Sequence, residues 1–448
     1  MIYLRGSAYD YDGWNRDLNY TKWGYDQALH YFKKSENQQR DKSKINASFH
    51  GFEGEWKISD NNYIHPISRK IVEAIQESGL PFESDFNSQK YSKESIGHNQ
   101  GNHFKGIRQS LSLAFLNDKV LKRKNLYIKV HTKVNRIIFD SNKNAIGVEI
   151  IDSIKGLKFI SAKKEVILSA GAIHSPQILM LSGIGDKNIL AKYNIPLIHD
   201  NKEVGQNLQD HPVITIIKTV KEPKSTLDHL LLNPTYLLKS IHWVLSKDNE
   251  FANILCEING WLLSDTAKKH KEDAPDLQLL GVAGIYTKNV FDNSHGLEGF
   301  TLGVVLLNQK SRGYVTISSN KCNDAPIIQP NFFENPEDLD RLEEGVKFML
   351  KVAEKKELKE IINLDVFPEK KDFDNLKYYI KNNVFSLYHP TSTCSMGKVV
   401  DERLRVFGVN KLRVVDASVM PNVTRANTNA PTAMIGENAS DMIKEDNI

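Results

Sequence analysis

The segment "YHPTSTCSMG", residues 388–397, carries a histidine that is suited to acid–base chemistry. His389 precedes a proline, which disfavours a helical conformation for the histidine and favours an extended one. Small polar residues surround it. An unperturbed imidazole titrates near neutral pH, as a general base should. The segment therefore predicts that His389 accepts a proton, although a lone histidine also suits a purely structural role.

A second polar segment, "NTNAPTAMIGENASD", begins at residue 427 and contains two asparagines just before a predicted helix. We expect the helix to start at Pro431, because proline is favoured in the first helical position. The positive end of its dipole would then lie behind Asn427 and Asn429. This arrangement predicts a site that stabilises negative charge developing on a ligand.

Small residues end a predicted strand in "EVILSAGAIHSPQILMLSGIG", residues 165–185. We expect a helix to follow from about Ser175. At such a turn, Ala170 and Gly171 would let a planar or phosphorylated ligand approach the backbone and the helix N-terminus. A tight turn that uses small residues for packing alone is the alternative interpretation.

The loop "VGQNLQDHP", residues 204–212, places Asp210 beside His211. Adjacent loop residues seldom converge on one ion, so we expect a hydrogen-bonded structural loop and no metal site. The three cysteines lie far apart and form no zinc or Cys-x-x-Cys pattern. They indicate a reducing compartment, and we expect the protein in the cytoplasm, with peripheral membrane association left open.

The elements that must position these residues alternate between helices and strands. Two helices have clear caps and apolar stripes: 65–79, with Ile67, Ile71 and Ile75, and 335–355, with Leu339, Leu342, Val346 and Leu350. Strand-like runs include 126–134, a hairpin over 136–151, a pair formed by 300–307 and 311–318, and the two apolar strands 165–172 and 412–418. The mixture predicts an α+β protein, with a nucleotide-binding layer around 120–215 and 385–448 interleaved with an antiparallel sheet.

Composition excludes several classes of function. The 448 residues are 40% hydrophobic and 25% charged, as in ordinary globular proteins. Basic residues number 59 against 55 acidic ones, and they are scattered, which argues against a nucleic-acid partner. No apolar run reaches the roughly 18–20 residues of a membrane span. A serine hydrolase is excluded because no Gly-x-Ser-x-Gly segment occurs.

Together, the segments resemble the glucose–methanol–choline (GMC) family of FAD-dependent oxidoreductases, most of all its choline-dehydrogenase-like branch. "SAGAIHSPQILMLSGIG" is similar to a signature of that family, and "VGQNLQDHP", "HPTSTCSMG" and "NTNAPTAMIGENASD" are similar to its other recurrent blocks, in the same order. Lesser matches, such as "NQKSRGYVTI" and "PNFFENPEDLDRL", extend the resemblance over essentially the whole chain.

The resemblance implies FAD as cofactor and oxidation of the CH–OH group of an alcohol, with hydride transfer to flavin N5. His389 would be the base, and Asn427 would bind the substrate oxygen. Contacts with FAD would come from Val134 at the adenine, Ala170 and Gly171 at the turn, Asp416 and Ala417 at the ribityl and phosphate part, and Asn429 and Pro431 at the pyrimidine edge. The implied divisions are an FAD-binding region over 1–215, a mainly substrate-binding domain over 216–384, and a return to the FAD domain over 385–448. The family's C-terminal region would cover about 300–440.

The opening "MIYLRGSAYDYDGW" resembles an internal segment of the family's FAD domain. In the family, a βαβ unit with a Gly-x-Gly-x-x-Gly turn comes before it, and this chain contains no such turn. We therefore expect an N-terminally truncated FAD domain that binds FAD poorly alone and leaves a sheet edge unpaired. The alternatives to an active enzyme are a non-catalytic fragment and a subunit that needs a separate N-terminal FAD-binding piece.

The identity of the substrate depends on weaker signals. Glu257, in "ILCEINGW", could place a carboxylate near the quaternary ammonium of choline, although a structural carboxylate is the commoner interpretation. Choline and aliphatic alcohols are both compatible with the sequence. The electron acceptor, oxygen or a quinone-type molecule, is left open, as is the oligomeric state.

Overall fold

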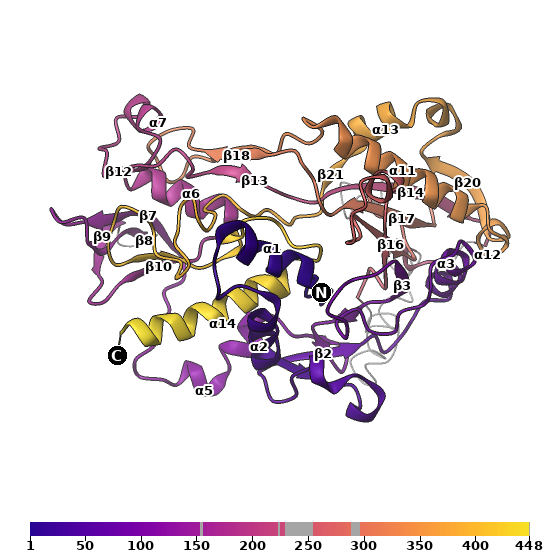
Figure 1. The fold of residues 1–448 in the computed structure, drawn as a ribbon, viewed down its shortest axis with the longest axis horizontal. Helices are drawn as coiled ribbons and strands as arrows, with labels where there is room; N and C mark the ends of the chain where they lie inside the picture. The colour runs from indigo at the N-terminus through magenta and orange to yellow at the C-terminus, as the bar shows by residue number, and fades with distance from the viewer. Residues whose placement is uncertain (153–155, 223–224, 229–253, 288–295, 448) are drawn as a thin grey trace.

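The computed structural model describes residues 1–152, 156–222, 225–228, 254–287 and 296–447. The molecule is elongated, with a large sheet and its helices at one end and a smaller α/β region at the other (Figure 1). Within the described ranges, no helix is long and apolar enough to cross a bilayer. The α+β class predicted from the sequence is confirmed.

A seven-stranded sheet forms the larger end, in the order β20-β14-β17-β16-β15-β3, with β21 also pairing with β14. Its strands are β3 (Ser95–His98), β14 (Pro212–Val220), β15 (Ile258–Leu262), β16 (Leu277–Val282), β17 (Gly299–Leu306), β20 (Ile362–Phe367) and β21 (Phe385–Ser386). All of these pairs are antiparallel. Every residue of β14 and β17 is buried, because helices cover one face and the rest of the protein covers the other.

Two helices cover the outer face of this sheet where the sequence predicted helices. In α11 (Pro336–Ala353), Asn335 accepts a hydrogen bond from Glu337 N, and Leu342 and Val346 are fully buried. Leu350 was expected in that buried face but is only half-buried, and Met349 takes the core position. Helix α3 (Pro66–Glu77) buries its isoleucine stripe in the same hydrophobic cluster.

The smaller end holds the nucleotide-binding type of layer. Strand β10 (Val166–Leu168) pairs in parallel with β22 (Leu412–Val414), beside a sheet of β7 (Thr132–Phe139), β8 (Ala145–Asp152) and β9 (Gly156–Ser161). Helices α6 (Gly171–Leu181), α2 (Tyr25–Ser35) and the long α14 (Asn429–Asp446) pack around them. The N-terminal aromatic residues, including Tyr11, Trp14 and Trp23, are buried in this same cluster.

The remaining helices and strands are distributed over both ends and the region between them. The other helices are α1 (Ala8–Leu18), α4 (Leu111–Phe115), α5 (Asp118–Leu121), α7 (Lys187–Lys192), α10 (Asp265–Lys269), α12 (Lys356–Lys359) and α13 (Leu376–Asn383). The short strands are β1 (Glu36–Gln38), β2 (Trp56–Asp60), β4 (Gln100–Gly101), β5 (His103–Phe104), β6 (Ile107–Arg108), β11 (Ile184–Gly185), β12 (His199–Asp200), β13 (Gln206–Leu208), β18 (Gly313–Thr316) and β19 (Ile327–Gln329).

Four expectations about these elements were wrong. Residues 126–130 form no strand, and Tyr127 is 88% exposed, because no described strand lies beside them to share backbone hydrogen bonds. The runs 300–307 and 311–318 do not pair with each other. Strand β17 lies in the large sheet, whereas β18 pairs with β13 and β19. Helix α6 begins at Gly171, not near Ser175, and α14 begins two residues before Pro431.

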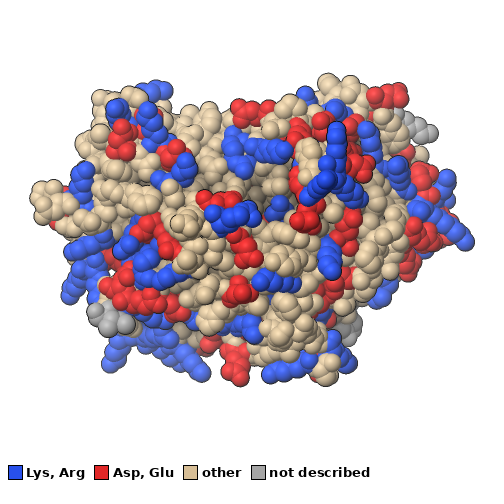
Figure 2. Space-filling view, viewed as in Figure 1, with Lys and Arg blue, Asp and Glu red and all other residues tan. Residues whose placement is uncertain are grey.

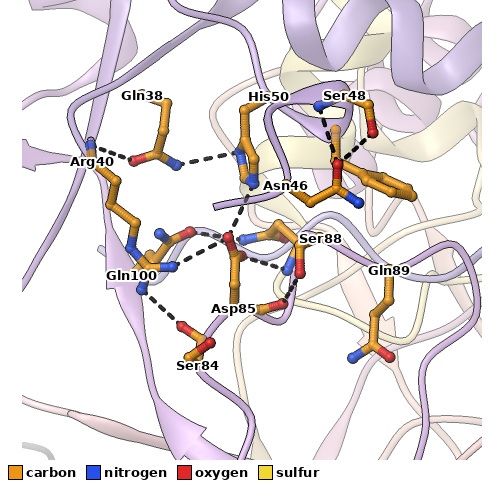
Figure 3. Close-up of polar contacts among 12 residues, drawn as sticks. Gln38, Arg40, Asn46, Ser48, His50, Ser84, Asp85, Ser88, Gln89 and Gln100 are labelled. Carbon is orange, nitrogen blue, oxygen red and sulfur yellow. Dashed lines mark hydrogen bonds and ion pairs between the residues drawn. The ribbon is translucent and has the colours of Figure 1, made fainter. Parts of the chain in front are cut away.

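A buried chain of charged groups holds the N-terminal segment in place. Arg5 forms an ion pair with Glu36, and the ring of His50 lies between Glu36 and Asp85, at 3.2 and 3.0 Å. Figure 3 shows the contact between His50 and Asp85. Arg40 contacts the same oxygen of Asp85, Oδ2, at 3.1 Å. Burial opposes a charged imidazole, but hydrogen bonds with Asp85 and Glu36 outweigh it and raise the pKa of His50. The opposite charges therefore compensate one another inside the fold.

The surface carries both signs of charge over the whole of the face shown in Figure 2. Lysine and arginine side chains alternate with aspartate and glutamate there, with no broad area of one sign. This distribution agrees with the small net charge of +4.

Candidate active site

The site lies where the large sheet meets the smaller end. His389 follows β21, and His211 precedes β14, so the antiparallel pairing of these two strands brings the two histidines together. The carboxylate of Asp210 joins the two segments. Its Oδ1 accepts hydrogen bonds from the backbone N–H of both His211 and His389, each at 2.8 Å. The hydroxyl of Ser386 donates to its Oδ2. The loop 204–212 is thus a hydrogen-bonded support, as the sequence predicted.

Left-handed backbone conformations flank His389. Tyr388 has φ +62° and Ser392 has φ +73°, values that non-glycine residues seldom adopt. Such strain costs about 1–3 kcal/mol and persists where surrounding contacts over-determine the conformation, often at functional sites. Here the contacts include the Asp210 hydrogen bond and the backbone pairing of Thr391 with Gln209.

The ring of His389 has a polar neighbour at each nitrogen. Its Nε2 lies 3.1 Å from Asn427 Nδ2, and its Nδ1 lies 2.9 Å from His211 Nδ1. An amide nitrogen only donates, so Nε2 accepts and the proton of neutral His389 is on Nδ1. That N–H donates to Nδ1 of His211. Nε2 is therefore the unprotonated nitrogen of the ring, and its lone pair faces Asn427.

Burial keeps both rings neutral. It lowers the pKa of His389 to about 3 and lowers the pKa of His211 well below its usual value, with the neighbouring imidazole adding to the effect on His211. Among the described residues, Asn427 Oδ1 is buried without a hydrogen-bond partner. A neutral acceptor and an unsatisfied carboxamide side by side are suited to binding a hydroxyl group.

These pKa shifts predict a pH dependence of stability. In the unfolded chain both histidines regain a pKa near 6.5 and bind protons below it, whereas the folded state does not. The free energy of unfolding should therefore fall as the pH decreases from 6.5, by up to about 1.4 kcal/mol per pH unit for each histidine. In His389→Gln the free energy of unfolding should fall less steeply with decreasing pH, because one fewer proton is bound on unfolding. Urea unfolding between pH 5 and 7.5 measures this slope. Equal slopes in the two proteins would contradict a neutral buried His389.

The second group of predicted site residues lies around the ends of β10 and β22. Asp416 Oδ2 accepts hydrogen bonds from Gly171 N at 2.9 Å and from the Ser175 hydroxyl at 2.6 Å. Ala170 is exposed at this turn, and a side chain at Gly171 (φ +80°) would meet nothing within 4 Å. Ala417 begins the short turn after Asp416. The backbone N–H groups of Ala170 and Gly171 thus donate within the protein, and open space lies beside Gly171.

The other predicted contacts have different surroundings. Asn429 is exposed and Pro431 is buried in the first turn of α14, beside Asn427. Val134 is half-buried on β7, paired with Ile150, away from the histidines.

Glu257 has the surroundings of a structural carboxylate. Its side chain is fully buried, and its carboxylate accepts hydrogen bonds from the backbone N–H of His65 at 3.1 and 3.0 Å. It supports the start of α3, in agreement with the structural interpretation of this residue. His211, in contrast, contacts the candidate base directly, which sequence reasoning missed. Its signal was a polar residue immediately before a buried strand, but the sequence did not identify the partner of that strand.

Comparison with known proteins places this geometry in a family. Two models, both described as GMC oxidoreductase, match the chain: an N-terminal one over residues 1–213 and a C-terminal one over residues 309–436. The chain belongs to the GMC oxidoreductase family. An alcohol dehydrogenase [acceptor] from Pseudomonas putida is 34% identical, over 99% of this chain and 79% of that protein. Human mitochondrial choline dehydrogenase is 33% identical, over 99% of this chain and 73% of that protein.

Solved structures give the same result for the fold. The formate oxidase of Aspergillus oryzae, in a study of FAD modification, superimposes with a TM-score of 0.90 and 25% identity, over 99% of this chain and 82% of the other. GMC oxidoreductases of this fold bind FAD, and FAD is the cofactor. The expectation of a missing N-terminal segment is not confirmed, since the N-terminal family model matches from residue 1.

The described residues fit FAD at its reactive end. The unsatisfied carboxamide oxygen of Asn427, the first turn of α14 and the open turn at Gly171 offer a polar acceptor, unpaired N–H groups and space. Asn429 and α14 would hold the ring, and Ala170, Gly171 and Ala417 would hold the chain that carries the phosphates.

Proposed function

We propose that this FAD-dependent oxidoreductase acts on the CH–OH group of an alcohol, with His389 as the base. The contact between His389 Nε2 and Asn427 Nδ2, 3.1 Å long, carries the proposal. It brings a proton acceptor and a hydrogen-bond donor into direct contact, and a hydroxyl oxygen that replaces this hydrogen bond could interact with both. The alcohol dehydrogenase and choline dehydrogenases among the relatives support the same class of reaction.

The two side chains would act on one oxygen atom. The substrate hydroxyl displaces the direct hydrogen bond between the two side chains, then donates to His389 Nε2 and accepts from Asn427 Nδ2. The O–H proton passes to Nε2 while the C–H bond breaks, so an alcohol becomes an aldehyde or ketone. FAD, when bound, supplies the acceptor for the hydride. A weakly basic imidazole suffices, because the oxygen becomes strongly acidic as the carbonyl forms.

His211 and Asp210 would prepare the base. His211 accepts the hydrogen bond from His389 Nδ1–H, so the lone pair stays on Nε2 and the imidazolium gains a partner when it forms. Asp210 fixes the backbone of both histidines. Neither residue contacts the substrate in this proposal, so both are positioning residues.

The proposal predicts that an alcohol alone will reduce the bound cofactor. The protein is reconstituted with FAD, purified from free FAD, and mixed without oxygen with a panel of primary alcohols that includes choline. Loss of the visible flavin absorbance, with one aldehyde formed per FAD, is the expected result. A protein that retains FAD but is reduced by none of the alcohols would refute the proposed reaction.

A second candidate is a chain that is not catalytic alone and needs a separate polypeptide to complete its FAD site. In the described parts of the chain, β10 pairs only with β22, and the apolar residues at 126–130 are exposed. Both features are those of an open sheet edge. A purified protein that stays colourless after incubation with FAD would favour this candidate.

The compartment and the final electron acceptor belong to the same proposal. All three cysteines are free, which supports a reducing compartment such as the cytoplasm. Either oxygen or a quinone-type molecule could reoxidise the flavin. Steady-state assays with oxygen and with a soluble quinone, compared at one alcohol concentration, separate the two.

A further inference from the structure

A cavity of about 150 Å³ opens beside Asn427, on the side of the large sheet. We call it the chamber. Its walls are strands β14, β16 and β17 and the segments that adjoin them. The lining residues are Ile2, Val213, Thr215, Leu255, Cys256, Leu280, Val282, Tyr286, Thr301, Gly303, Leu387 and Asn427. A molecule whose hydroxyl group contacts Asn427 would have its carbon body here.

The described lining of the chamber carries no charged side chain. Its hydroxyl and thiol groups are neutral and partly occupied within the protein. Thr301 donates to Gly284 O at 2.8 Å and accepts from Tyr286 N at 2.9 Å. Burial raises the pKa of Cys256 to about 11, so its thiol stays protonated, with Ile258 O as acceptor. Burial also raises the pKa of Tyr286. The wall therefore offers apolar contact and little electrostatic attraction.

The nearest carboxylate in sequence points elsewhere. Glu257 follows Cys256, and it is bound to the backbone of His65 rather than lining the chamber. A quaternary ammonium in the chamber would have no described counter-ion and only Tyr286 as an aromatic face. Burial of an unpaired charge is strongly unfavourable, and cation–π recognition normally uses several rings.

The size of the chamber limits the substrate further. An engineered apolar cavity of about 150 Å³ in another protein accommodates benzene, which has six carbon atoms. A carbon body of about four to seven atoms would therefore fill this chamber. Each buried methylene group should raise kcat/KM by about fourfold until the space is full.

We infer that the substrate is an uncharged primary alcohol with an apolar body of about four to seven carbons, seated in the chamber with its hydroxyl at Asn427 and His389. This inference rests on the proposed alcohol oxidation. It separates this chain from the choline dehydrogenases, which are 32–33% identical to it. The uncharged lining and the buried position of Glu257 carry it.

The test compares choline with 3,3-dimethylbutan-1-ol, which has the same shape and no charge. In the FAD-loaded protein, kcat/KM for the neutral alcohol should exceed that for choline by at least about 100-fold, and it should rise from ethanol to hexan-1-ol. Equal values, or a preference for choline, would overturn the inference while leaving the proposed function intact. Loss of both activities in a protein that retains FAD would instead refute the proposed function.

Two variants locate the effect. Val282→Phe, which fills the chamber, should lower the ratio of kcat/KM for hexan-1-ol to kcat/KM for ethanol by more than about tenfold. Glu257→Gln should leave the ratio of kcat/KM for 3,3-dimethylbutan-1-ol to kcat/KM for choline unchanged. If the Glu257 carboxylate bound choline, its removal would lower kcat/KM for choline selectively. If Val282→Phe does not fold, calorimetric binding of the two isosteres to FAD-loaded His389→Ala gives the same comparison without turnover. Tighter binding of choline there would also overturn the inference.

Discussion

Substitution of His389 by alanine is expected to lower the rate of flavin reduction by an alcohol about 10²- to 10⁴-fold, the usual contribution of a positioned base. The loss should appear in kcat more than in KM, because Asn427 still binds the hydroxyl. Stopped-flow mixing of the FAD-loaded protein with an alcohol, without oxygen, measures this step directly.

A matched control uses a histidine outside the site. His30 is exposed on α2, so His30→Ala should reduce flavin at the wild-type rate. FAD content and the melting temperature are measured for both variants, because burial of His389 gives it a packing role as well. A His389→Ala protein that binds FAD and keeps the full reduction rate would show that another group takes the proton.

Substitution of His211 by phenylalanine should lower the same rate about 10- to 100-fold, as is typical when a partner that orients an active histidine is removed. Phenylalanine fills the space but accepts no hydrogen bond, so Nδ1–H of His389 loses its acceptor and the proton can move to Nε2. The reactive lone pair would then point away from the substrate. The measurement is flavin reduction in single turnover, with KM determined in parallel.

A conservative variant separates this role from simple packing. His211→Gln offers a carboxamide oxygen in place of the ring nitrogen and should recover part of the lost rate, whereas a packing defect would be corrected no better by glutamine than by phenylalanine. Full activity in His211→Phe would refute the positioning role and leave His389 as an unassisted base.

Local signals in the sequence were sufficient to predict the helices that have clear capping residues and an apolar face. Helix α3 begins at Pro66 and α11 is capped by Asn335, as expected, because proline and asparagine act on neighbouring N–H groups. The β7–β8 hairpin was found for the same reason, since its two strands are joined by a short turn. These interactions span only a few residues.

Pairings between distant segments were not accessible in this way. The segment 126–130 has the composition of a strand, but a strand needs a partner, and no described one pairs with it. Likewise, β17 and β18 are neighbours in sequence and lie in different sheets. The contact of His211 with His389 joins residues 178 positions apart, through the pairing of β14 with β21. A single sequence can point to each histidine as a candidate, but it does not show that the two are in contact.

The site is assembled from both ends of the molecule. His389 is attached to the large sheet through β21, whereas Asn427 precedes α14, which packs in the smaller end. A small hydrophobic cluster packs Val213 and Val305 of the large sheet against Ala426, which directly precedes Asn427. The separation of base and amide thus depends on how the two halves are docked, and a rotation that shifts one half by an ångström would open the 3.1 Å contact. If heating loosens the packing between the two halves, turnover should therefore be lost at a lower temperature than that at which either half unfolds.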